Sequence, residues 1–482
     1  MPAEVLNLVA GVPTEGEPFD VMNPAAYDEV VGIGHAAGVK DVDAAVNAAS
    51  AVGAEWARTP LEERVAAVLK GISLATSTGD PDELPTLLTR EQGKRLQESR
   101  IEISHATEIV KQFASLAEGA LAEEVLRDEL GTRVRRHRPV GPVAAITPWN
   151  WPLVLSLVKI APALMTGNPV ILKPPPNTPL TVTRVMSALA RELPPGVLSV
   201  LNGGANIGAE LAGHPLIRKV AFTGSTPNGR KVYASAATTV KNLTLELGGN
   251  DPAILLDDAE LDERSLSLLL GAAFITTGQV CWAIKRLYVP RSRYAEVVSA
   301  LTSALSDFVV GNGLDPMVRL GPLNNRNQLQ IVRRLADGAR SGGANVHMLG
   351  SYAPGLDPER GYYHLPTLVT DVDHTAAIVS EEQFGPILPI VPYDNEEQVV
   401  AMANDTEYGL SASVWSADPD RAFGVARQLE TGTVFVNAHG GPALDFTTGA
   451  GGVKQSGIGR ELGVVGLLQY TEAQSLTNRV RL

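Results

Sequence analysis

Short apolar segments alternate with helical ones from Pro139 onward, and this alternation constrains the fold more than any other feature of the chain. Repeated β-α units favour a parallel sheet with helices on both faces. The predicted strands are 143–146, 169–172, 197–201 and 219–222. Ligands of such sheets bind beyond the carboxyl ends of the strands. We therefore expect the turns at 147–150, 173–177, 202–204 and 223–225 to converge on one crevice.

The size and charge of the chain narrow the class of protein. With 482 residues, of which 44% are hydrophobic and 19% charged, it is too long for one core and too apolar to be disordered. The net charge of −13 argues against binding a nucleic-acid backbone. The N-terminus lacks the pattern of a secretory signal, and the uncharged run 265–284 contains too many polar residues and glycines for a membrane span. We expect a cytoplasmic protein that binds neither nucleic acid nor membrane.

Other segments predict further elements. Residues 41–119 show apolar positions at helical spacing, and strand–helix alternation resumes between about 256 and 416, which indicates a second α/β domain. Two charged, partly alternating runs around Gly131 predict a hairpin that leaves the domain, and the chain ends in a strand-like run. No cysteine–histidine pair has metal-ligand spacing, so no metal site is expected.

Cys281 is the only cysteine of the chain. A lone cysteine is usually a small buried hydrophobic residue, but this one follows two other polar groups suited to carbonyl chemistry. A carboxylate, Glu246, lies upstream beside two glycines, and an amide, Asn150, lies between Pro148 and Pro152. A nucleophile, a base and an oxyanion donor are the parts required for covalent catalysis on a carbonyl.

Two glycine-rich segments resemble dinucleotide fingerprints, at 32–38 and 457–463. Each has one residue too many before the last glycine, and neither opens a helix after a predicted strand. With 46 glycines in the chain, such matches arise by chance. We therefore do not expect a phosphate site at either segment.

Taken together, the motifs resemble those of the NAD(P)-dependent aldehyde dehydrogenases along nearly the whole chain. Their order is that of the family: Pro148-Trp149-Asn150, Ile171-Leu172-Lys173-Pro174, Phe222-Thr223-Gly224-Ser225, Leu245-Glu246-Leu247-Gly248-Gly249, Gly278-Gln279-Val280-Cys281, Glu381-Glu382-Gln383-Phe384-Gly385-Pro386, Tyr408-Gly409-Leu410 and Lys454-Gln455-Ser456-Gly457. The resemblance implies a Rossmann-like cofactor domain at 1–120 and 140–248, a catalytic domain at 249–448, and an oligomerisation hairpin and tail at 121–139 and 465–482.

The resemblance also implies catalytic roles. The Cys281 thiolate would attack the aldehyde and form a thiohemiacetal, with its own backbone N–H and the Asn150 amide holding the oxyanion. Loss of hydride to the nicotinamide would leave a thioester, and Glu246 would activate the water that releases the carboxylic acid. Lys159 and Glu461 match a pair proposed as a proton relay; solvated surface charge is the alternative for both.

NAD is the cofactor that the resemblance implies, with NADP possible. Lys173 matches the lysine at the adenosine ribose, Ser225 lies at the pyrophosphate, and Glu382 matches the carboxylate at the nicotinamide ribose, near which Phe384 would pack. The other expected cofactor contacts are Thr147, Pro148, Trp149, Gly208, Phe222, Gly224 and Leu247.

Three departures from the family pattern bear on specificity. Pro176 replaces the glutamate that repels a 2′-phosphate in many NAD-preferring members, but it adds no cation. Ala450 replaces an aromatic wall of the substrate pocket, which implies a wider or differently shaped pocket. Trp151 and Trp282 add bulk where smaller side chains are usual.

Two alternatives to an acid-forming aldehyde dehydrogenase stay open. In a CoA-acylating enzyme CoA would take the acyl group, although that branch generally lacks the carboxylate found at Glu246. The other is a catalytically silent protein on the same scaffold, for which the changes at Pro176 and Ala450 leave room. The hairpin and tail match segments that pair between subunits, which implies a homodimer or homotetramer.

Overall fold

The computed structural model describes residues 3–77 and 79–480. Its first sheet has eight strands in the order β24-β12-β11-β8-β9-β10-β2-β3. The parallel centre consists of β12 (Asn242–Glu246), β11 (Lys219–Thr223), β8 (Val143–Ile146), β9 (Val170–Lys173) and β10 (Leu198–Val200). Antiparallel strands flank this centre: β2 (Asn7–Val9) and β3 (Val12–Thr14) at one edge, β24 (Gly457–Ile458) at the other.

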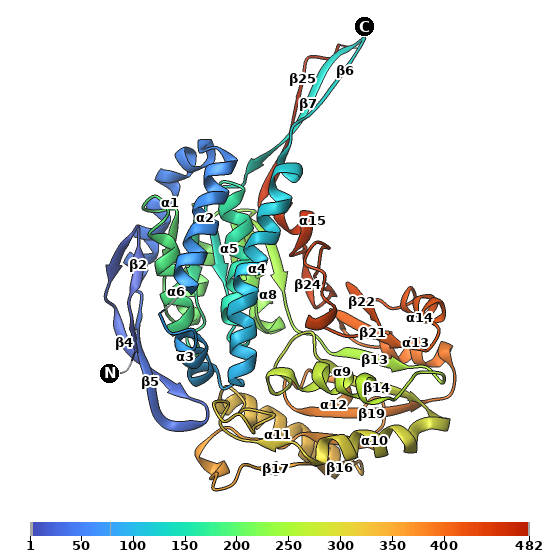
Figure 1. The fold of residues 1–482 in the computed structure, drawn as a ribbon. Coiled ribbons are helices and arrows are strands. Elements are labelled where there is room, and N and C mark those ends of the chain that lie inside the picture. The colour runs from blue at the N-terminus through green and yellow to red at the C-terminus, as the bar shows by residue number, and fades with distance from the viewer. Residues whose placement is uncertain (1–2, 78, 481–482) are drawn as a thin grey trace.

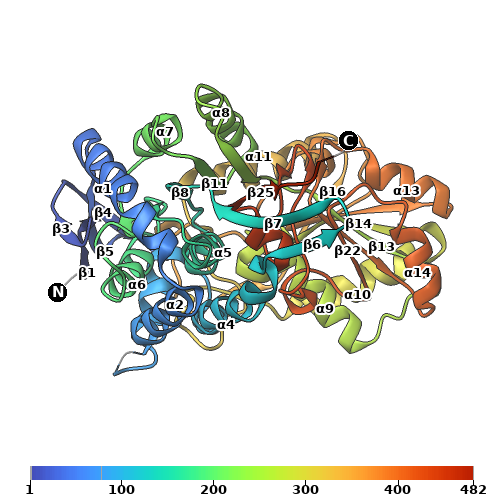
Figure 2. The ribbon, with the colours of Figure 1, turned by 90° about the horizontal axis from the view of Figure 1, so that it is seen from above.

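Helices cover both faces of this sheet, as the β-α alternation predicts (Figure 2). Two separate apolar clusters form because strand side chains alternate between the faces. One face packs α2 (Leu61–Thr76), α4 (Leu96–Leu121), α5 (Pro152–Met165) and α6 (Leu180–Ala190). The other packs α1 (Val39–Arg58), α7 (Ala205–Gly213) and α8 (Thr226–Ala237), while α3 (Glu83–Gln92) contacts α4 and α6.

The chain reverses direction across the sheet at β8. From β8 it runs through β9 to β10 on one side, and then returns to β11 and β12 on the other. Such a reversal opens a crevice at the carboxyl ends of the strands. The turns after these strands therefore share one edge of the sheet, as the sequence predicts.

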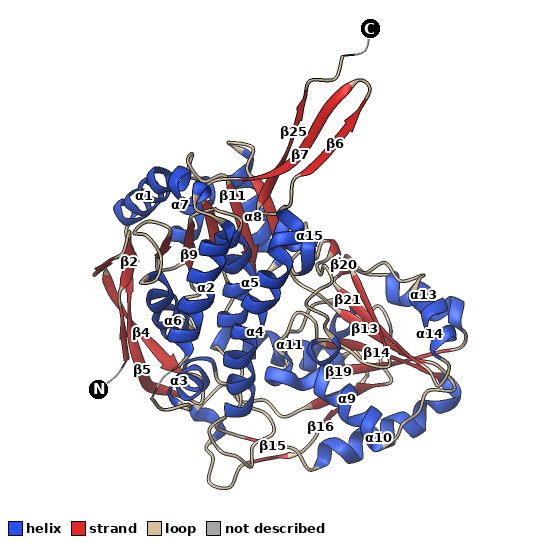
Figure 3. Ribbon diagram, turned by 45° about the horizontal axis from the view of Figure 1, so that its top comes forward, coloured by secondary structure: helices blue, strands red, loops and turns tan. Residues whose placement is uncertain are grey.

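The second sheet has the order β16-β18-β19-β14-β13-β21-β22 and is parallel except for the β16–β18 pair. Figure 3 shows several of its strands, among them β13, β14, β19 and β21. Its strands are β13 (Asp251–Leu255), β14 (Ile284–Pro290), β16 (Asn345–Met348), β18 (Thr367–Thr370), β19 (Ile387–Tyr393), β21 (Ser411–Trp415) and β22 (Thr433–Val436). One face packs α9 (Glu263–Phe274) and α10 (Tyr294–Ser306). The other packs α11 (Arg326–Ser341), α12 (Ala377–Ser380), α13 (Glu396–Asn404) and α14 (Pro419–Ala426).

A three-stranded sheet projects from the body and carries the C-terminal end of the chain (Figure 1). It consists of β6 (Glu124–Asp128), β7 (Gly131–Pro139) and β25 (Thr471–Thr477), with β25 following the short helix α15 (Gly463–Leu468). Every residue of β6 is exposed, so this strand is a free edge of the sheet. The predicted hairpin is confirmed, while Arg481 and Leu482 of the predicted tail lie outside the described residues.

The strands before residue 37 were not predicted. Besides β2 and β3 they are β1 (Ala3–Val5), β4 (Glu17–Asn23) and β5 (Ala26–Ala36), which form a sheet of their own. The glycine-rich segment 32–38 overlaps β5, where Gly32 allows close strand packing: a Cβ there would lie 2.3 Å from the carbonyl oxygen of Ala3. This glycine serves strand pairing. Among the described residues, no helix is long and apolar enough to cross a membrane.

Candidate active site

Cys281 lies on a loop between the 3₁₀ turn η1 (Ile275–Gly278) and β14. Within the turn, Thr276 and Thr277 have left-handed backbones, with φ of 51° and 58°. That region is unfavourable for β-branched residues and costs on the order of 1–3 kcal/mol each. The strain persists only because the surroundings hold the loop, and such strain is typical of functional sites.

Hydrogen bonds from several elements hold this turn. The Thr276 amide donates to Oε1 of Glu98 on α4 at 2.9 Å, and the indole of Trp151 donates to the Thr276 hydroxyl at 3.1 Å. The Gln279 side chain donates to the Thr276 carbonyl at 2.9 Å. The loop is thus tied to α4, to the β8–α5 connection and to itself, which fixes the position of Cys281.

Gly248 and Gly249 bring the end of β12 against the Cys281 loop. A Cβ at Gly249 would lie 2.6 Å from the Cys281 carbonyl oxygen, and a Cβ at Gly248 would lie 2.7 Å from Oε2 of Glu382. The first distance leaves no room for a side chain, and the second would require the Glu382 carboxylate to move. The two glycines therefore allow the loop after Glu246, the Cys281 loop and Glu382 to meet.

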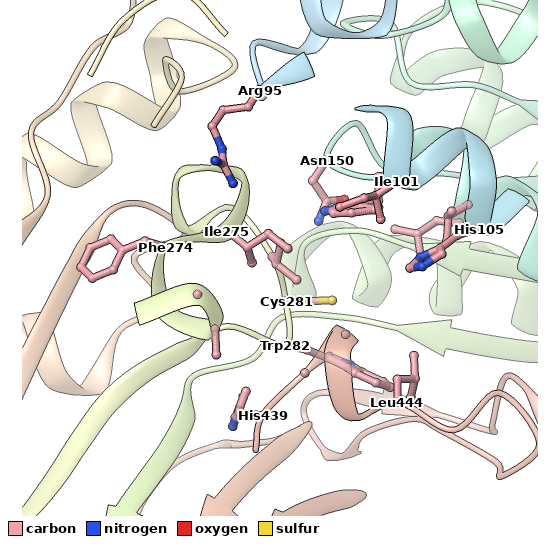
Figure 4. Close-up of a pocket in the computed structure, with 18 of the residues that line it drawn as sticks. Arg95, Ile101, His105, Asn150, Phe274, Ile275, Cys281, Trp282, His439 and Leu444 are labelled. Carbon is pink, nitrogen blue, oxygen red and sulfur yellow. The ribbon is translucent and has the colours of Figure 1, made fainter. Parts of the chain in front are cut away.

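Cys281 lies on the wall of a cavity of about 1190 Å³ (Figure 4). Asn150, Glu246 and Glu461 line the same cavity, so the structure brings the predicted nucleophile, amide and base together. Most of the remaining lining is apolar or aromatic: Ile101, Ile109, Trp151, Val154, Leu155, Val158, Phe274, Ile275, Trp282, Leu444, Phe446, Ala450 and Leu462. The site combines polar chemistry at Cys281 with apolar walls.

Asn150 is buried, and its Nδ2 donates to the Gln279 carbonyl at 3.0 Å. An amide nitrogen carries two hydrogens, so the second N–H stays available. Lys94 fixes the backbone at Asn150, because its Nζ donates to the Asn150 carbonyl at 2.8 Å. The same Nζ pairs with Glu102 at 2.5 Å. Glu102 in turn accepts from the first amides of α5, at Leu153 and Val154.

Sequence reasoning missed this support. Lys94 and Glu102 have fully buried side chains, although both lie in a polar stretch of sequence that is typical of a solvated helix surface. Their partners are fixed by tertiary packing, and no local pattern marks them. The Lys94 ammonium also lies 4.2 Å from the Trp151 ring centroid, so the same pair holds the tryptophan that walls the cavity.

Glu246 ends β12, where it is buried, and its Oε1 has no hydrogen-bond partner among the described residues. Burial raises the pKa of Glu246 well above its ordinary value, and the charge of Glu461 raises it further. Lys159 and Glu461 form the expected pair: Lys159 Nζ lies 2.5 Å from Oε1 of Glu461 and donates to Thr223 Oγ1 at 2.6 Å. Lys159 is fully buried, so the surface-charge alternative is wrong for this residue.

The pKa of the Cys281 thiol is raised as well. Burial raises its pKa above the ordinary range, and the carboxylates of Glu246, Asp251 and Glu382 add to the effect. Asp251 was not singled out from the sequence. It begins β13, accepts from both the amide and the hydroxyl of Ser411, and lies 3.7 Å from Nε2 of the buried His439.

The expected cofactor residues gather at the carboxyl edge of the first sheet. The Thr147 amide donates to the Lys173 carbonyl at 3.2 Å, joining the turns after β8 and β9. Lys173 is buried against Gly208, where a Cβ would lie 3.5 Å from the lysine Cδ. Burial lowers the pKa of Lys173 to about 8. Its Nζ donates to the Pro174 carbonyl at 2.8 Å.

The N-terminus of α8 faces the same edge. Ser225 caps the helix through its backbone only and is itself exposed, and no side chain in the described part of the chain accepts from the first-turn amides. Gly224 donates from its amide to the Glu246 carbonyl at 3.0 Å and lies against the Phe222 ring, while Leu247 packs against Gly229 of the helix. A free helix N-terminus attracts anions.

Glu382 and Phe384 come from the second half of the chain. Glu382 is half-buried and accepts from the Gly249 amide at 3.0 Å; the loss of solvent around its carboxyl raises its pKa to about 7. Phe384 has a left-handed backbone, with φ of 49°, and its ring meets that of Trp149 edge-on at 5.5 Å. Pro148 precedes this tryptophan. Phe384 thus lies against the turn after β8, and Glu382 lies against the turn after β12.

The departures noted in the sequence take different positions. Pro176 is exposed beyond β9. Ala450 is buried in the cavity wall, with Trp151 and Trp282 also lining it. Among the described residues, no group of three His, Cys, Asp or Glu side chains is arranged to hold a metal ion.

Comparison with known proteins agrees with this geometry. Residues 12–476 match the model of the aldehyde dehydrogenase family. The chain is 40% identical over 379 residues, 78% of each chain, to geranial dehydrogenase of Castellaniella defragrans.

Solved structures match over almost the whole chain. An NADP-dependent enzyme from E. coli has a TM-score of 0.92 at 33% identity, with 98% of each chain covered. Betaine aldehyde dehydrogenase of Staphylococcus aureus in complex with NAD⁺ has a TM-score of 0.93 at 31% identity, covering 98% of this chain and 94% of the other. The predicted fold class and aldehyde oxidoreductase function are confirmed: the chain belongs to the aldehyde dehydrogenase family.

Proposed function

We propose that this protein oxidises an aldehyde with a largely apolar body to the carboxylic acid, with NAD or NADP as the hydride acceptor. The observation that carries the proposal is the shared cavity of Cys281, Asn150 and Glu246 beside the crevice of a Rossmann-like sheet. The similarity to an NADP-dependent enzyme and to a structure in complex with NAD⁺ supports the cofactor.

The residues at the sheet edge fit a dinucleotide. The helix α8 has twelve residues and no side-chain cap at its N-terminus. The backbone amides of its first turn would bind the pyrophosphate. The Lys173 ammonium would reach the adenosine ribose, and Glu382 would accept hydrogen bonds from the nicotinamide ribose. Thr147, Pro148, Trp149, Gly208, Phe222, Gly224, Leu247 and Phe384 would form the walls of the site. When bound, the nicotinamide supplies the hydride acceptor.

Cys281 would be the nucleophile. Its raised pKa means that the thiol must lose its proton as the aldehyde is attacked. The oxyanion would be held by the Cys281 backbone N–H and by the second N–H of Asn150; losing one such donor typically costs about 3 kcal/mol of barrier. After hydride loss, a thioester on Cys281 remains.

Glu246 would be the base that activates water against the thioester. A buried carboxyl with a raised pKa is a stronger base than an exposed one, which suits Glu246 to accept a proton from water. Lys159 and Glu461 lie near Glu246, and the charges of both affect its pKa. Lys159 also donates to Thr223, the last residue of β11 at the sheet edge. We infer that this pair carries the proton from Glu246 toward solvent.

The cavity walls favour a substrate whose body is largely apolar. Aromatic and aliphatic side chains surround Cys281, and burial of apolar surface contributes about 25 cal/mol per Å². The relative named for geranial acts on an aldehyde of this kind. Ala450 leaves open the space that an aromatic side chain would fill.

The experiment is an assay of purified protein with a panel of aldehydes, with NAD and NADP supplied separately. Reduced cofactor and free acid are expected, and Cys281→Ala should abolish both. Acyl-CoA in place of acid when CoA is added would favour the CoA-acylating alternative, against which Glu246 stands. Cofactor binding without turnover on any aldehyde would favour the silent alternative.

Assembly, domain limits and location are also proposals. The free edge of β6 beside β7 and β25 invites pairing with another subunit, so we infer a homodimer or homotetramer. We assign cofactor binding to 1–120 and 140–248, catalysis to 249–448, and subunit pairing to 121–139 and 465–482. A cytoplasmic location is consistent with the single cysteine.

A further inference from the structure

One face of α4 lines the cavity with a polar residue between two apolar ones. Ile101, His105 and Ile109 follow one another at four-residue spacing, so they lie on the same face of the helix. An unbroken apolar stripe would be the simplest wall for an apolar substrate. His105 interrupts it.

The imidazole of His105 has no hydrogen bond to any described residue. Its recorded contact is with the Phe446 ring, which it meets edge-on at 6.0 Å and 75°. The residue is half-buried. In Figure 4 its ring extends from α4 toward the space that Cys281 faces. Because the half-buried ring lines the cavity, a molecule bound there would cut its nitrogens off from solvent.

Displacing water from a polar group is unfavourable unless the incoming molecule replaces the hydrogen bond. A purely apolar aldehyde that fills the cavity would leave the His105 nitrogens without a partner. A substrate with one polar group at this position would satisfy them. The histidine therefore acts against the first kind of substrate and in favour of the second.

We propose that His105 is a specificity-determining residue that hydrogen-bonds a neutral hydroxyl group of the aldehyde, remote from the reacting carbonyl. A hydroxyl both donates and accepts, so it matches either tautomer of the imidazole. The carboxyl groups of Glu246 and Glu461 line the same cavity, and they disfavour a substrate that carries a carboxylate of its own. The rings of Trp151, Trp282 and Phe446 favour a flat, unsaturated body. The substrate class is a hydroxylated aromatic or conjugated aldehyde.

The inference rests on the proposed aldehyde oxidation, and matched substrates separate the two. The test compares benzaldehyde and cinnamaldehyde with their 2-, 3- and 4-hydroxy derivatives and their 4-carboxy derivatives, using wild type, His105→Leu and His105→Gln. Ile101→Leu is the control, because it changes the same helix face without changing a polar group. The readout is the ratio of kcat/KM for each substituted aldehyde to that of its parent.

In wild type, at least one hydroxy aldehyde should exceed its parent. His105→Leu should lower that ratio roughly tenfold, the effect of one hydrogen bond of about 1.4 kcal/mol. His105→Gln should restore much of it, and Ile101→Leu should leave it unchanged.

Equal changes for parent and hydroxy aldehydes in His105→Leu would overturn the assignment, as would a preference for the carboxy derivatives. Absence of turnover with every aldehyde in wild type would instead refute the proposed function.

Discussion

Lys159 and Glu461 are 302 residues apart in the chain, yet the lysine Nζ lies 2.5 Å from Oε1 of Glu461 inside the protein. The pair joins α5, which packs in the core of the first domain, to the segment that precedes α15 and β25. It also lies close enough to Glu246 for both charges to affect that carboxyl. The proposed base is thus held in a field set by two distant parts of the chain.

Removing one member of this pair should destabilise the protein strongly. Lys159→Met leaves the Glu461 carboxylate without its partner, and such losses cost roughly 3–5 kcal/mol. The double variant Lys159→Met/Glu461→Gln should recover much of the loss, because no uncompensated charge remains. The control is the Lys70–Glu192 pair, in which the lysine is exposed: Lys70→Met should cost under about 1 kcal/mol. Denaturant unfolding measures all of these, and similar losses at both sites would contradict the interpretation.

Glu246→Gln should become progressively more stable than wild type as pH rises. The pKa of Glu246 is raised in the folded state, so its contribution to stability is fully present below the unfolded value of 4.5 and is lost as pH rises toward the folded pKa. Glutamine carries no charge and has no such loss. Unfolding free energies between pH 5 and 9 should diverge, whereas exposed Glu118→Gln should follow wild type. If the difference in unfolding free energy between Glu246→Gln and wild type does not change with pH, the pKa of Glu246 is not raised in the folded state.

Alkylation of Cys281 should be slow and strongly dependent on pH. Burial and neighbouring carboxylates raise the pKa of the thiol, so the reactive thiolate is scarce at neutral pH. The rate with iodoacetamide should rise about tenfold per pH unit without levelling by pH 10. Glu246→Gln should react faster than wild type because one carboxylate charge is gone. As the chain has one cysteine, mass spectrometry reads the labelling directly. A plateau below pH 9 would show an ordinary thiol.

Pro176→Glu should separate the two cofactors. Pro176 is exposed beyond β9, on the same turn as Lys173, where a carboxylate would repel a 2′-phosphate and accept hydrogen bonds from ribose hydroxyls. We expect the Kd for NADP to rise at least about tenfold while that for NAD falls or stays the same. Pro176→Gln is the uncharged control. Equal effects on both cofactors would place the adenosine ribose elsewhere.

The strands and helices after Pro139 were predictable because each is short, apolar and followed by a polar turn. The strands β8, β9, β10 and β11 are buried, so their sequences are mostly apolar or small-residue runs that local pattern detects. The motif order then gave Cys281, Glu246 and Asn150. The strands before residue 37 escaped notice because β4 and β5 mix charged residues and glycines with apolar ones.

The supports of the site were not predictable in the same way. Lys94, Glu98 and Glu102 are buried charges whose partners lie on other elements, so no spacing in the sequence reveals them. His105 is likewise an ordinary helical histidine until the fold turns its face toward Cys281. Such roles depend on which surfaces meet in three dimensions. Local sequence carries no record of that.

The most direct test of the account is the fate of Cys281 in Glu246→Gln protein mixed with an oxidisable aldehyde and NAD. If Cys281 is the nucleophile and Glu246 the base for hydrolysis, one equivalent of NADH per subunit should form in a rapid burst. Mass spectrometry should then find the acyl group on Cys281, and steady turnover should fall by a factor of roughly 10²–10⁴. A variant that shows neither burst nor acyl-cysteine, or that turns over like wild type, would contradict the account.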